Sequence, residues 1–382
     1  MKISRRNFLA VAGAAAAAAA LTACGGSSAS STSTASSAAA SSSAASGAAD
    51  GAEKIAKVAL TCDTGTIDDE SFNQACWAAV SSYMGDNCQY YIPDSDASDE
   101  DRETMIRQAV NDGADVIVCV GYLYGASLAW AADQYPDVKF IAVDVTQGDI
   151  GTDSIPANCY CITFKEEQAG YLAGYAITKD GKTKLGFLGG MAVPAVIRYG
   201  YGFVQGADAA AKEIGATDVN IKYWYSGGFA ATDEVKNKMD GWYSEGTEVV
   251  FACGGPVCQS CDAAAQANGG KMIGVDVDQS GQFDTVITSA TKGLAESVNE
   301  ALTDAMNNGW KFSETYSGKE TKLGAAENCV GLPMSTSKFT KFTQEQYDSM
   351  YASIVDGTLA IDDSFDADVK PAVTTITVDY QS

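Results

Sequence analysis

The stretch "DVIVCVGYLYGASLAWAADQYPDVKFIAVD" (residues 115–144) sets the fold class. Its two apolar runs, 115–121 and 139–145, flank an alanine-rich segment with a helical pattern. Nearly continuous apolar runs are typical of strands buried on both faces, as in parallel sheets covered by helices. The pattern recurs where "GTEVVFACGG" (246–255) leads through a helical segment to "KMIGVDV" (271–277). The matched endings in glycine and in Val-Asp-Val indicate two similarly built halves.

Strand and helix patterns alternate along most of the remaining chain. Further strands are predicted at 57–62, 89–93, 159–164, 184–190, 221–226, 249–255, 272–278 and 285–291, with a late strand in "TTITVDY" at 374–380. Amphipathic helices are predicted at 71–84, 100–111, 166–178 and 196–214. This alternation predicts an α/β protein with two doubly wound parallel-sheet lobes. We expect lobe 1 to comprise residues 54–165 plus about 285–330, and lobe 2 to comprise 183–284 plus the C-terminal segment.

The N-terminal segment has the pattern of an export signal rather than of a fold. "SRRNFLA" (4–10) is a twin-arginine pattern, an alanine-rich run follows, and "LTAC" (21–24) resembles a bacterial lipobox. Residues 1–24 therefore predict a lipoprotein signal in which Cys24 becomes the lipidated first residue, exported by the twin-arginine route or by general secretion. Residues 25–53 are almost entirely Ser, Ala, Thr and Gly, which predicts a disordered tether.

Charge and composition exclude several classes of function. The chain has a formal net charge of −24, and loss of Lys2, Arg5 and Arg6 with the signal would make it −27. Such a surface repels nucleic acid and free phosphates. Histidine is absent, which excludes a His-dependent hydrolase triad. The sequence also has no Walker-type loop and no Gly-x-Gly-x-x-Gly motif between a strand and a helix.

The chain contains 11 cysteines, of which ten follow Cys24. Most of these ten lie in apolar runs where a small hydrophobic side chain would fit, so we interpret them as core residues. Disulfide pairing stays open for an exported protein. Cys253, Cys258 and Cys261 suggest a metal site only weakly, because no fourth ligand lies nearby in the sequence.

Polar and glycine residues follow the predicted strands where ligands bind to open parallel sheets. In such sheets the ligand lies beyond the carboxyl ends of the strands, near the N-termini of helices. The residues at these ends are Asp63, Gly121, Tyr122, Asp144, Gly189, Gly190, Gly254, Gly255 and Asp276. We expect the glycines to let backbone approach a ligand and the aspartates to accept hydrogen bonds. Two lobes facing each other through such edges would form a hinged cleft.

The segment "CDTGTIDDESFNQ" (62–74) combines many acidic groups with a predicted helix start. Ser71 and Gln74 fit a capping box, with Ser71 as the cap. The acids at 68–70 would complement the helix dipole, whereas Asp63 at the strand end has no such role. The acidic spacing lacks the alternation of a calcium-binding loop.

Several long motifs resemble those of the basic membrane protein family, the purine nucleoside receptor lipoproteins that serve ABC importers. They are "VALTCDTGTIDDESFNQACW", "DVIVCVGYLYGASLAWAADQYPDVKFIAVD", "ITFKEEQAGYLAGYAI", "KLGFLGGMAVPAVIRYGYGFVQG", "IGVDVDQ" and "ITSATKG". The resemblance spans about residues 54–306 and implies the type I periplasmic-binding fold, with two α/β lobes joined by hinge crossovers.

The resemblance also implies roles for individual residues. Asp63 and Phe72 resemble residues that bond the edge of a base and stack on its face. Tyr199 stands where the family usually has phenylalanine as the opposing stacking face. Asp276 and Lys292 match the pair that grips the ribose hydroxyls. With the strand-end residues, the predicted ligand-binding set is Asp63, Phe72, Asn73, Gly121, Tyr122, Asp144, Tyr199, Gly255, Asp276 and Lys292.

Two departures from the family pattern affect the predicted cleft. The turn after the 249–253 strand is "CGGPVCQSC" (253–261), where the family usually has a Gly-Gly-Thr-Gly-like turn, and Pro256 lacks an amide donor. A family glutamate is replaced by Gly200. The resemblance makes Asp144 a further polar contact to base or ribose.

These patterns predict a lipid-anchored solute-binding protein that captures a nucleoside, with a purine favoured, for the permease of an ABC importer. We expect it to be a monomer on the outer face of the cell membrane that is not an enzyme, needs no cofactor or metal and does not bind nucleic acid. One alternative is a protein of the same fold that binds a sugar, a flavin-like aromatic or a signalling molecule. A nucleoside hydrolase is a remote alternative, because "DTGTIDDE" lacks the dense calcium-binding cluster.

Overall fold

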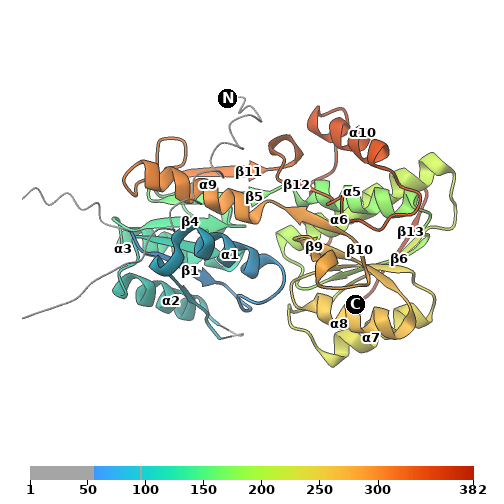
Figure 1. Cartoon of the computed structure of the whole chain (residues 1–382), viewed down its shortest axis with the longest axis horizontal. Helices are drawn as coiled ribbons and strands as arrows, with labels where there is room; N and C mark the ends of the chain where they lie inside the picture. The colour runs from blue at the N-terminus through green and yellow to red at the C-terminus, as the bar shows by residue number, and fades with distance from the viewer. Residues whose placement is uncertain (1–55, 95–96) are drawn as a thin grey trace, which may run out of the picture. The chain divides into compact units, whose positions relative to one another are not determined.

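The computed structural model describes residues 56–94 and 97–382 (Figure 1). The predicted signal, the lipidation site Cys24 and the predicted tether lie outside the described residues. Within the part described, no helix has the length and apolar character needed to cross a membrane.

Thirteen strands and ten α-helices are assigned in the described residues. The strands are β1 (Val58–Cys62), β2 (Cys88–Tyr91), β3 (Val116–Val120), β4 (Lys139–Val143), β5 (Cys159–Phe164), β6 (Lys184–Gly189), β7 (Asn220–Tyr225), β8 (Val249–Cys253), β9 (Lys271–Asp276), β10 (Val286–Lys292), β11 (Lys319–Leu323), β12 (Val330–Gly331) and β13 (Thr377–Tyr380). The helices are α1 (Phe72–Met84), α2 (Asp99–Asn111), α3 (Gly125–Gln134), α4 (Gln147–Ile150), α5 (Glu166–Lys179), α6 (Pro194–Ile214), α7 (Asp233–Ser244), α8 (Val257–Asn268), α9 (Leu294–Asn307) and α10 (Gln344–Val355).

The strands form two sheets. The first has the order β11-β5-β4-β3-β1-β2 and is parallel throughout. The second has the order β12-β10-β9-β8-β6-β7-β13, and its pairs are parallel except for β10 with β12. We call the first sheet with its helices lobe 1 and the second lobe 2. The predicted parallel α/β architecture is confirmed, and the predicted strands begin and end within about two residues of observed ones, apart from the longer C-terminal prediction.

Each sheet is covered by helices on both faces. In lobe 1, α2 and α3 cover one face, and α1 and α9 cover the other. In lobe 2, α7 and α8 cover one face, and α5 and α6 cover the other. Successive residues of one strand enter opposite clusters: in β1, Leu60 packs with α1 and Ala59 packs towards α2. Burial on both faces explains why these strands read as continuous apolar runs.

The chain passes between the sheets three times. It leaves lobe 1 between β5 and α5 at Lys165, returns between β10 and α9 at Gly293, and crosses again after β11 at Gly324. The Lys165 N–H donates to the Leu323 carbonyl at 2.8 Å, and the Gly293 N–H donates to the Cys329 carbonyl at 2.7 Å. These bonds tie neighbouring crossings together.

The crossings correct one predicted boundary. Residues about 285–330 were assigned to lobe 1, but β10 pairs with β9 and β12 pairs with β10 in the sheet of lobe 2. Helix α9 and strand β11 do lie with the elements of lobe 1, as their orange ribbons beside α1 and β5 show (Figure 1). The apolar run of β10 carries no signal that identifies its partner strand, so the sequence could not place it.

Helices α5 and α6 approach each other through glycines on both sides. A Cβ at Gly170 or Gly174 of α5 would lie 2.1 or 2.0 Å from the carbonyl oxygens of Tyr199 and Phe203 of α6. Gly202 and Gly206 of α6 meet α5 carbonyl oxygens at similar distances. The two backbones are therefore in direct contact, and this contact fixes where the N-terminal half of α6 lies.

Candidate functional site

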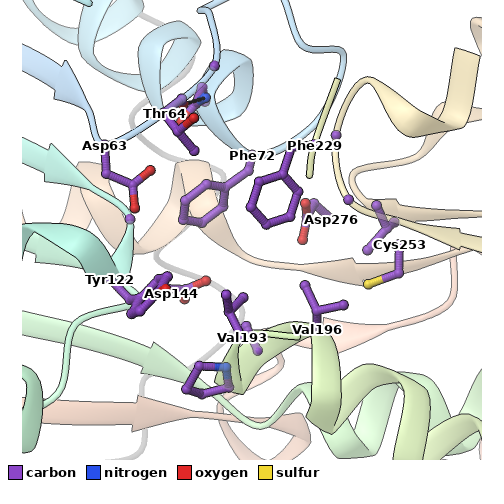
Figure 2. A pocket seen from close by; sticks show the side chains of 18 of the residues that line it. Asp63, Thr64, Phe72, Tyr122, Asp144, Val193, Val196, Phe229, Cys253 and Asp276 are labelled. Carbon is purple, nitrogen blue, oxygen red and sulfur yellow. Dashed lines mark hydrogen bonds between the residues drawn. The ribbon is translucent and has the colours of Figure 1, made fainter. Parts of the chain in front are cut away.

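A cavity of about 970 Å³, its open mouth included, lies between the carboxyl ends of the two sheets. All ten residues of the predicted ligand-binding set line it, although no bound ligand tests their roles. Figure 2 shows Asp63, Tyr122 and Asp144 towards one side, with Asp276 and Cys253 towards the other.

Asp63 follows β1 and lies in a close-fitting part of the cavity wall. Its Oδ2 accepts the Leu123 N–H at 3.1 Å, and its carbonyl oxygen accepts from the Arg102 guanidinium at 3.3 Å. A Cβ at Gly121 would lie 2.1 Å from the carboxyl of Asp63, and φ at Gly121 is +110°, so glycine is required there. Burial raises the pKa of Asp63 to about 7. The side chain is therefore poised between its acid and its carboxylate near neutral pH.

The entry of α1 is capped by Asp69, not by Ser71. The Asp69 carboxyl accepts the N–H groups of Ser71, Asn73 and Gln74 at 3.0, 2.9 and 3.0 Å. The predicted capping box is therefore wrong, because a longer acceptor two residues earlier reaches the same amides. Burial nevertheless raises the pKa of Asp69 to about 6. Ser71 is left free to donate elsewhere.

Asn73 lines the cavity with an unsatisfied acceptor. Its Nδ2 donates to the Thr64 carbonyl at 3.0 Å, whereas its buried Oδ1 has no hydrogen-bond partner. Asp144 Oδ1 is likewise buried without a partner. Buried acceptors of this kind are costly unless a donor reaches them. A ligand that brings hydrogen-bond donors would satisfy both.

Three partly exposed aromatic residues line the cavity. They are Phe72 at the start of α1, Tyr122 just after β3 and Phe229 in the loop after β7, and all three are labelled in Figure 2. Sequence analysis missed Phe229, although it is an aromatic within the glycine-rich loop "SGGFAATD". A Cβ at Gly190 would lie 2.4 Å from this ring, and a Cβ at Gly254 would lie 3.2 Å from it. These two glycines therefore make room for Phe229, and Gly254 also lines the cavity.

Tyr199 of α6 differs from these three residues, because it is only 2% exposed. Its hydroxyl donates to Asp276 Oδ1 at 3.3 Å. Burial raises the pKa of Tyr199 well above its usual value, so the hydroxyl stays protonated. Its predicted stacking role stays a prediction.

Lys292 is the buried cation of the site. Its Nζ lies 2.6 Å from Asp144, 3.5 Å from Glu166 and 3.7 Å from Asp276. It also lies 4.6 Å from the centroid of the Phe72 ring. Burial disfavours the ammonium, but the three acidic groups outweigh it and raise the pKa of Lys292.

Asp144 and Asp276 occupy equivalent positions in the two lobes. Each ends the second strand of the repeated motif, and each has left-handed backbone, with φ of +58° and +65°. Such φ values are uncommon outside glycine and often mark functional positions. Burial raises the pKa of Asp144, and Lys292 opposes this shift.

Glu166 and Arg198 form a buried ion pair that sequence analysis did not predict. Their Oε2 and Nε atoms lie 2.7 Å apart, and Glu166 is fully buried. Burial disfavours the charged form, but Arg198 and Lys292 outweigh it and lower the pKa of Glu166. The quoted family motifs contain both residues, but a buried pair between two helices leaves no mark in local spacing.

Several polar bonds near the cavity join the two lobes. Ser71 Oγ donates to Asp276 Oδ2 at 2.6 Å, and Gln279 Nε2 donates to the Glu70 carbonyl at 2.9 Å. The Lys292–Asp144 pair also spans the lobes. The loop that leads into α1 is thus held against the end of β9 and the turn that follows it.

The altered turn after β8 starts a helix. Gly254 and Gly255 have φ of +153° and +53°, and Pro256 stands at the N-cap of α8, where a missing N–H is tolerated. Cys258 and Cys261 of α8 are buried among apolar side chains. The described part of the chain contains no disulfide and no cluster suited to a metal ion.

Gly200 has no room for a side chain. A Cβ at this position would lie 2.1 Å from the Tyr223 hydroxyl and 2.7 Å from Phe187. The aromatic side chains of Tyr223 and Phe187 in lobe 2 occupy this space.

Comparison with known proteins identifies the family. A model of the Bmp family, described as PnrA-like ABC transporter substrate-binding proteins, matches residues 55–364. The chain belongs to this family. It is therefore an ABC transporter substrate-binding protein, and the resemblance of its motifs to those of the basic membrane protein family is confirmed. A model of the twin-arginine translocation signal matches residues 2–22, which indicates export.

Individual relatives agree with this assignment. Basic membrane protein A of Borreliella burgdorferi is 29% identical over 306 residues, which are 79% of this chain and 86% of that protein. A Lactococcus lactis protein described as an ABC transporter nucleoside-binding protein, BmpA, is 29% identical over 238 residues, covering 58% of this chain and 64% of that protein. A solute-binding protein structure from Aeropyrum pernix K1 is similar with a TM-score of 0.68 at 22% identity, covering 82% of this chain and 95% of that chain. The fold is the type I periplasmic-binding fold.

Proposed function

We propose that this substrate-binding protein captures a purine nucleoside between its lobes and delivers it to the permease of an ABC importer. The observation that carries the proposal is the composition of the cavity. It combines an open aromatic face at Phe72, unpaired acceptors at Asn73 and Asp144, and the Asp276–Lys292 pair. A nucleoside offers a flat ring, donors on its base edge and a vicinal diol, which match these three parts.

The chemistry of each part supports a neutral ligand. Aromatic side chains stack on any base, at about 1–3 kcal/mol for each base in nucleic-acid complexes. A carboxylate accepts hydrogen bonds from hydroxyls, and an ammonium donates to their oxygens. Asp63, Asp144 and Asp276 around the same space disfavour a phosphate, so a nucleoside fits better than a nucleotide.

No covalent step is part of the proposed cycle. Bending at the crossings would close the lobes over the ligand, and ligand binding would shift the balance towards the closed form. Ser71 and Gln279 of the two lobes supply bonds that such closure would use.

Calorimetric titration with guanosine, inosine and adenosine tests the proposal. We expect binding of at least one of them and a loss of tenfold or more in affinity in Asp276→Asn, because a charged acceptor of the diol is removed. Asp278→Asn is the matched control, since Asp278 bonds Ser280 and Thr336 and does not line the cavity. Absence of binding to all three purine nucleosides would refute the proposal.

Mass spectrometry of ligand that co-purifies from a native preparation would identify the natural solute. A sugar or a flavin-like molecule in place of a nucleoside would assign the cavity to the alternative ligand class.

We also propose that the protein is held at the outer face of the membrane through lipid on Cys24. The lipobox-like "LTAC" and the Ser/Ala-rich segment after it support this. Phase separation in detergent of the protein expressed in its native host tests this anchor. We expect Cys24→Ser to move the protein from the detergent phase to the aqueous phase, with Cys88→Ser as the control. Continued partition of Cys24→Ser into detergent would contradict the anchor.

A further inference from the structure

The hydroxyl of Tyr199 bears on which sugars the cavity accepts. Tyr199 lies on α6 and Asp276 ends β9, so both belong to lobe 2 and their 3.3 Å bond does not depend on lobe closure. Asp276 Oδ2 has a second donor in Ser71, at 2.6 Å. Both oxygens of this buried carboxyl group are therefore paired by the protein's own hydroxyls.

When a ligand lacks one hydroxyl, the loss of binding affinity depends on whether a buried acceptor of the protein is left unpaired. A site that hydrogen-bonds a hydroxyl rejects the analogue without it chiefly because a buried acceptor is then unpaired. Here Tyr199 and Ser71 keep the two oxygens of Asp276 paired in either case. A carboxylate still has further lone pairs, so a sugar hydroxyl can add its own bond without displacing Tyr199.

We propose that Tyr199 is a specificity-determining residue that makes the cavity tolerant of deoxynucleosides as well as ribonucleosides. This inference rests on the proposed nucleoside-binding function and deepens it. Loss of one sugar hydroxyl then removes a single net hydrogen bond, which is worth about two- to tenfold in affinity. A phenylalanine at position 199 would have no hydroxyl with which to pair the acceptor.

Tyr199→Phe provides the test, because it removes one oxygen and keeps the ring. Titrations of wild type and variant with guanosine and 2′-deoxyguanosine give the ratio of the two dissociation constants. We expect a ratio below about tenfold in wild type and a ratio at least about fivefold larger in the variant. Tyr201→Phe is the matched control, since Tyr201 is also buried on α6 but its hydroxyl donates to the carbonyls of Asp366 and Ala367.

The outcomes separate the inference from the function on which it rests. A wild-type ratio above tenfold, or an equal loss for both nucleosides in Tyr199→Phe, would overturn the inference while leaving nucleoside binding intact. Failure of wild type to bind any purine nucleoside would overturn both. Thermal unfolding of each variant establishes that the fold persists, and a wild-type ratio above tenfold refutes the inference even if Tyr199→Phe does not fold.

Discussion

Titration of Asp63 should give ligand affinity and protein stability opposite dependences on pH. The pKa of this carboxyl is raised to about 7 by burial, against about 3.8 for the ordinary group. If the ionised form accepts a hydrogen bond from the base, affinity rises with pH up to about 7 and levels off above it. At pH 5 about one molecule in a hundred has Asp63 ionised, so we expect affinity about 100-fold below its plateau, or about 2.7 kcal/mol.

Stability of the ligand-free protein should change in the other direction. A carboxyl with a raised pKa binds its proton more tightly in the folded state, so its stabilising contribution is complete below pH 4 and is lost as the pH rises towards 7. The difference of about three pKa units corresponds to at most about 4 kcal/mol. Asp63→Asn should remove most of the pH dependence of affinity but only part of that of stability. Buried Glu167, whose pKa is also raised to about 7, and Asp69 and Asp144, whose pKa values are raised as well, keep their own contributions.

Calorimetric titration and urea unfolding between pH 5 and pH 8 measure the two quantities. Asp218→Asn, at an exposed site away from the cavity, is the control and should keep the wild-type dependences. Affinity that stays constant or increases as the pH falls from 8 to 5 would refute this account of Asp63.

Two further predictions concern the scaffold of the site. Gly174→Ala should lower the free energy of unfolding by about 1–3 kcal/mol or more, because its Cβ would meet an α6 carbonyl oxygen at 2.0 Å. Gly241→Ala in α7, where nothing lies within 4 Å, should stabilise by roughly 0.5–1 kcal/mol; equal effects in urea unfolding would contradict the close contact. Arg198→Met should cost up to about 3–5 kcal/mol, because Glu166 then keeps only Lys292, 3.5 Å away, as an opposite charge, and adding Glu166→Gln should recover much of this loss. A double variant as unstable as the single one in denaturant titration would argue against the pair.

The core strands could be predicted from sequence because burial on both faces makes them uniformly apolar. Strand β11 was missed, since "KETKL" is an edge strand whose residues are largely exposed. The sheet to which β10 belongs could not be predicted either, because an apolar run does not indicate which strand it will pair with. The first failure reflects exposure, which removes the apolar signal of a strand, and the second reflects pairing, which is a property of the whole fold.

The residues of the candidate site also divide into those that could be predicted from the sequence and those that could not. Strand endings located Asp63, Asp144 and Asp276, because a parallel sheet places such residues at one edge. Ser71 was misassigned as a cap, since its partner lies 205 residues away in the chain. Phe229 and the Glu166–Arg198 pair depend on contacts between separate elements, for which the sequence has no periodic signal.

The crossings between lobes confine any bending to very few bonds. Lys165 and Gly293 each stand alone between the end of a strand and the start of a helix, with nearly equal dihedral angles of −95°, 69° and −77°, 59°. The helix that follows Lys165 is locked backbone to backbone against α6 and cannot yield. Opening of the lobes would therefore be a rotation about these two single-residue connections. Substitutions at Lys165 or Gly293, outside the cavity, would change how readily the lobes open.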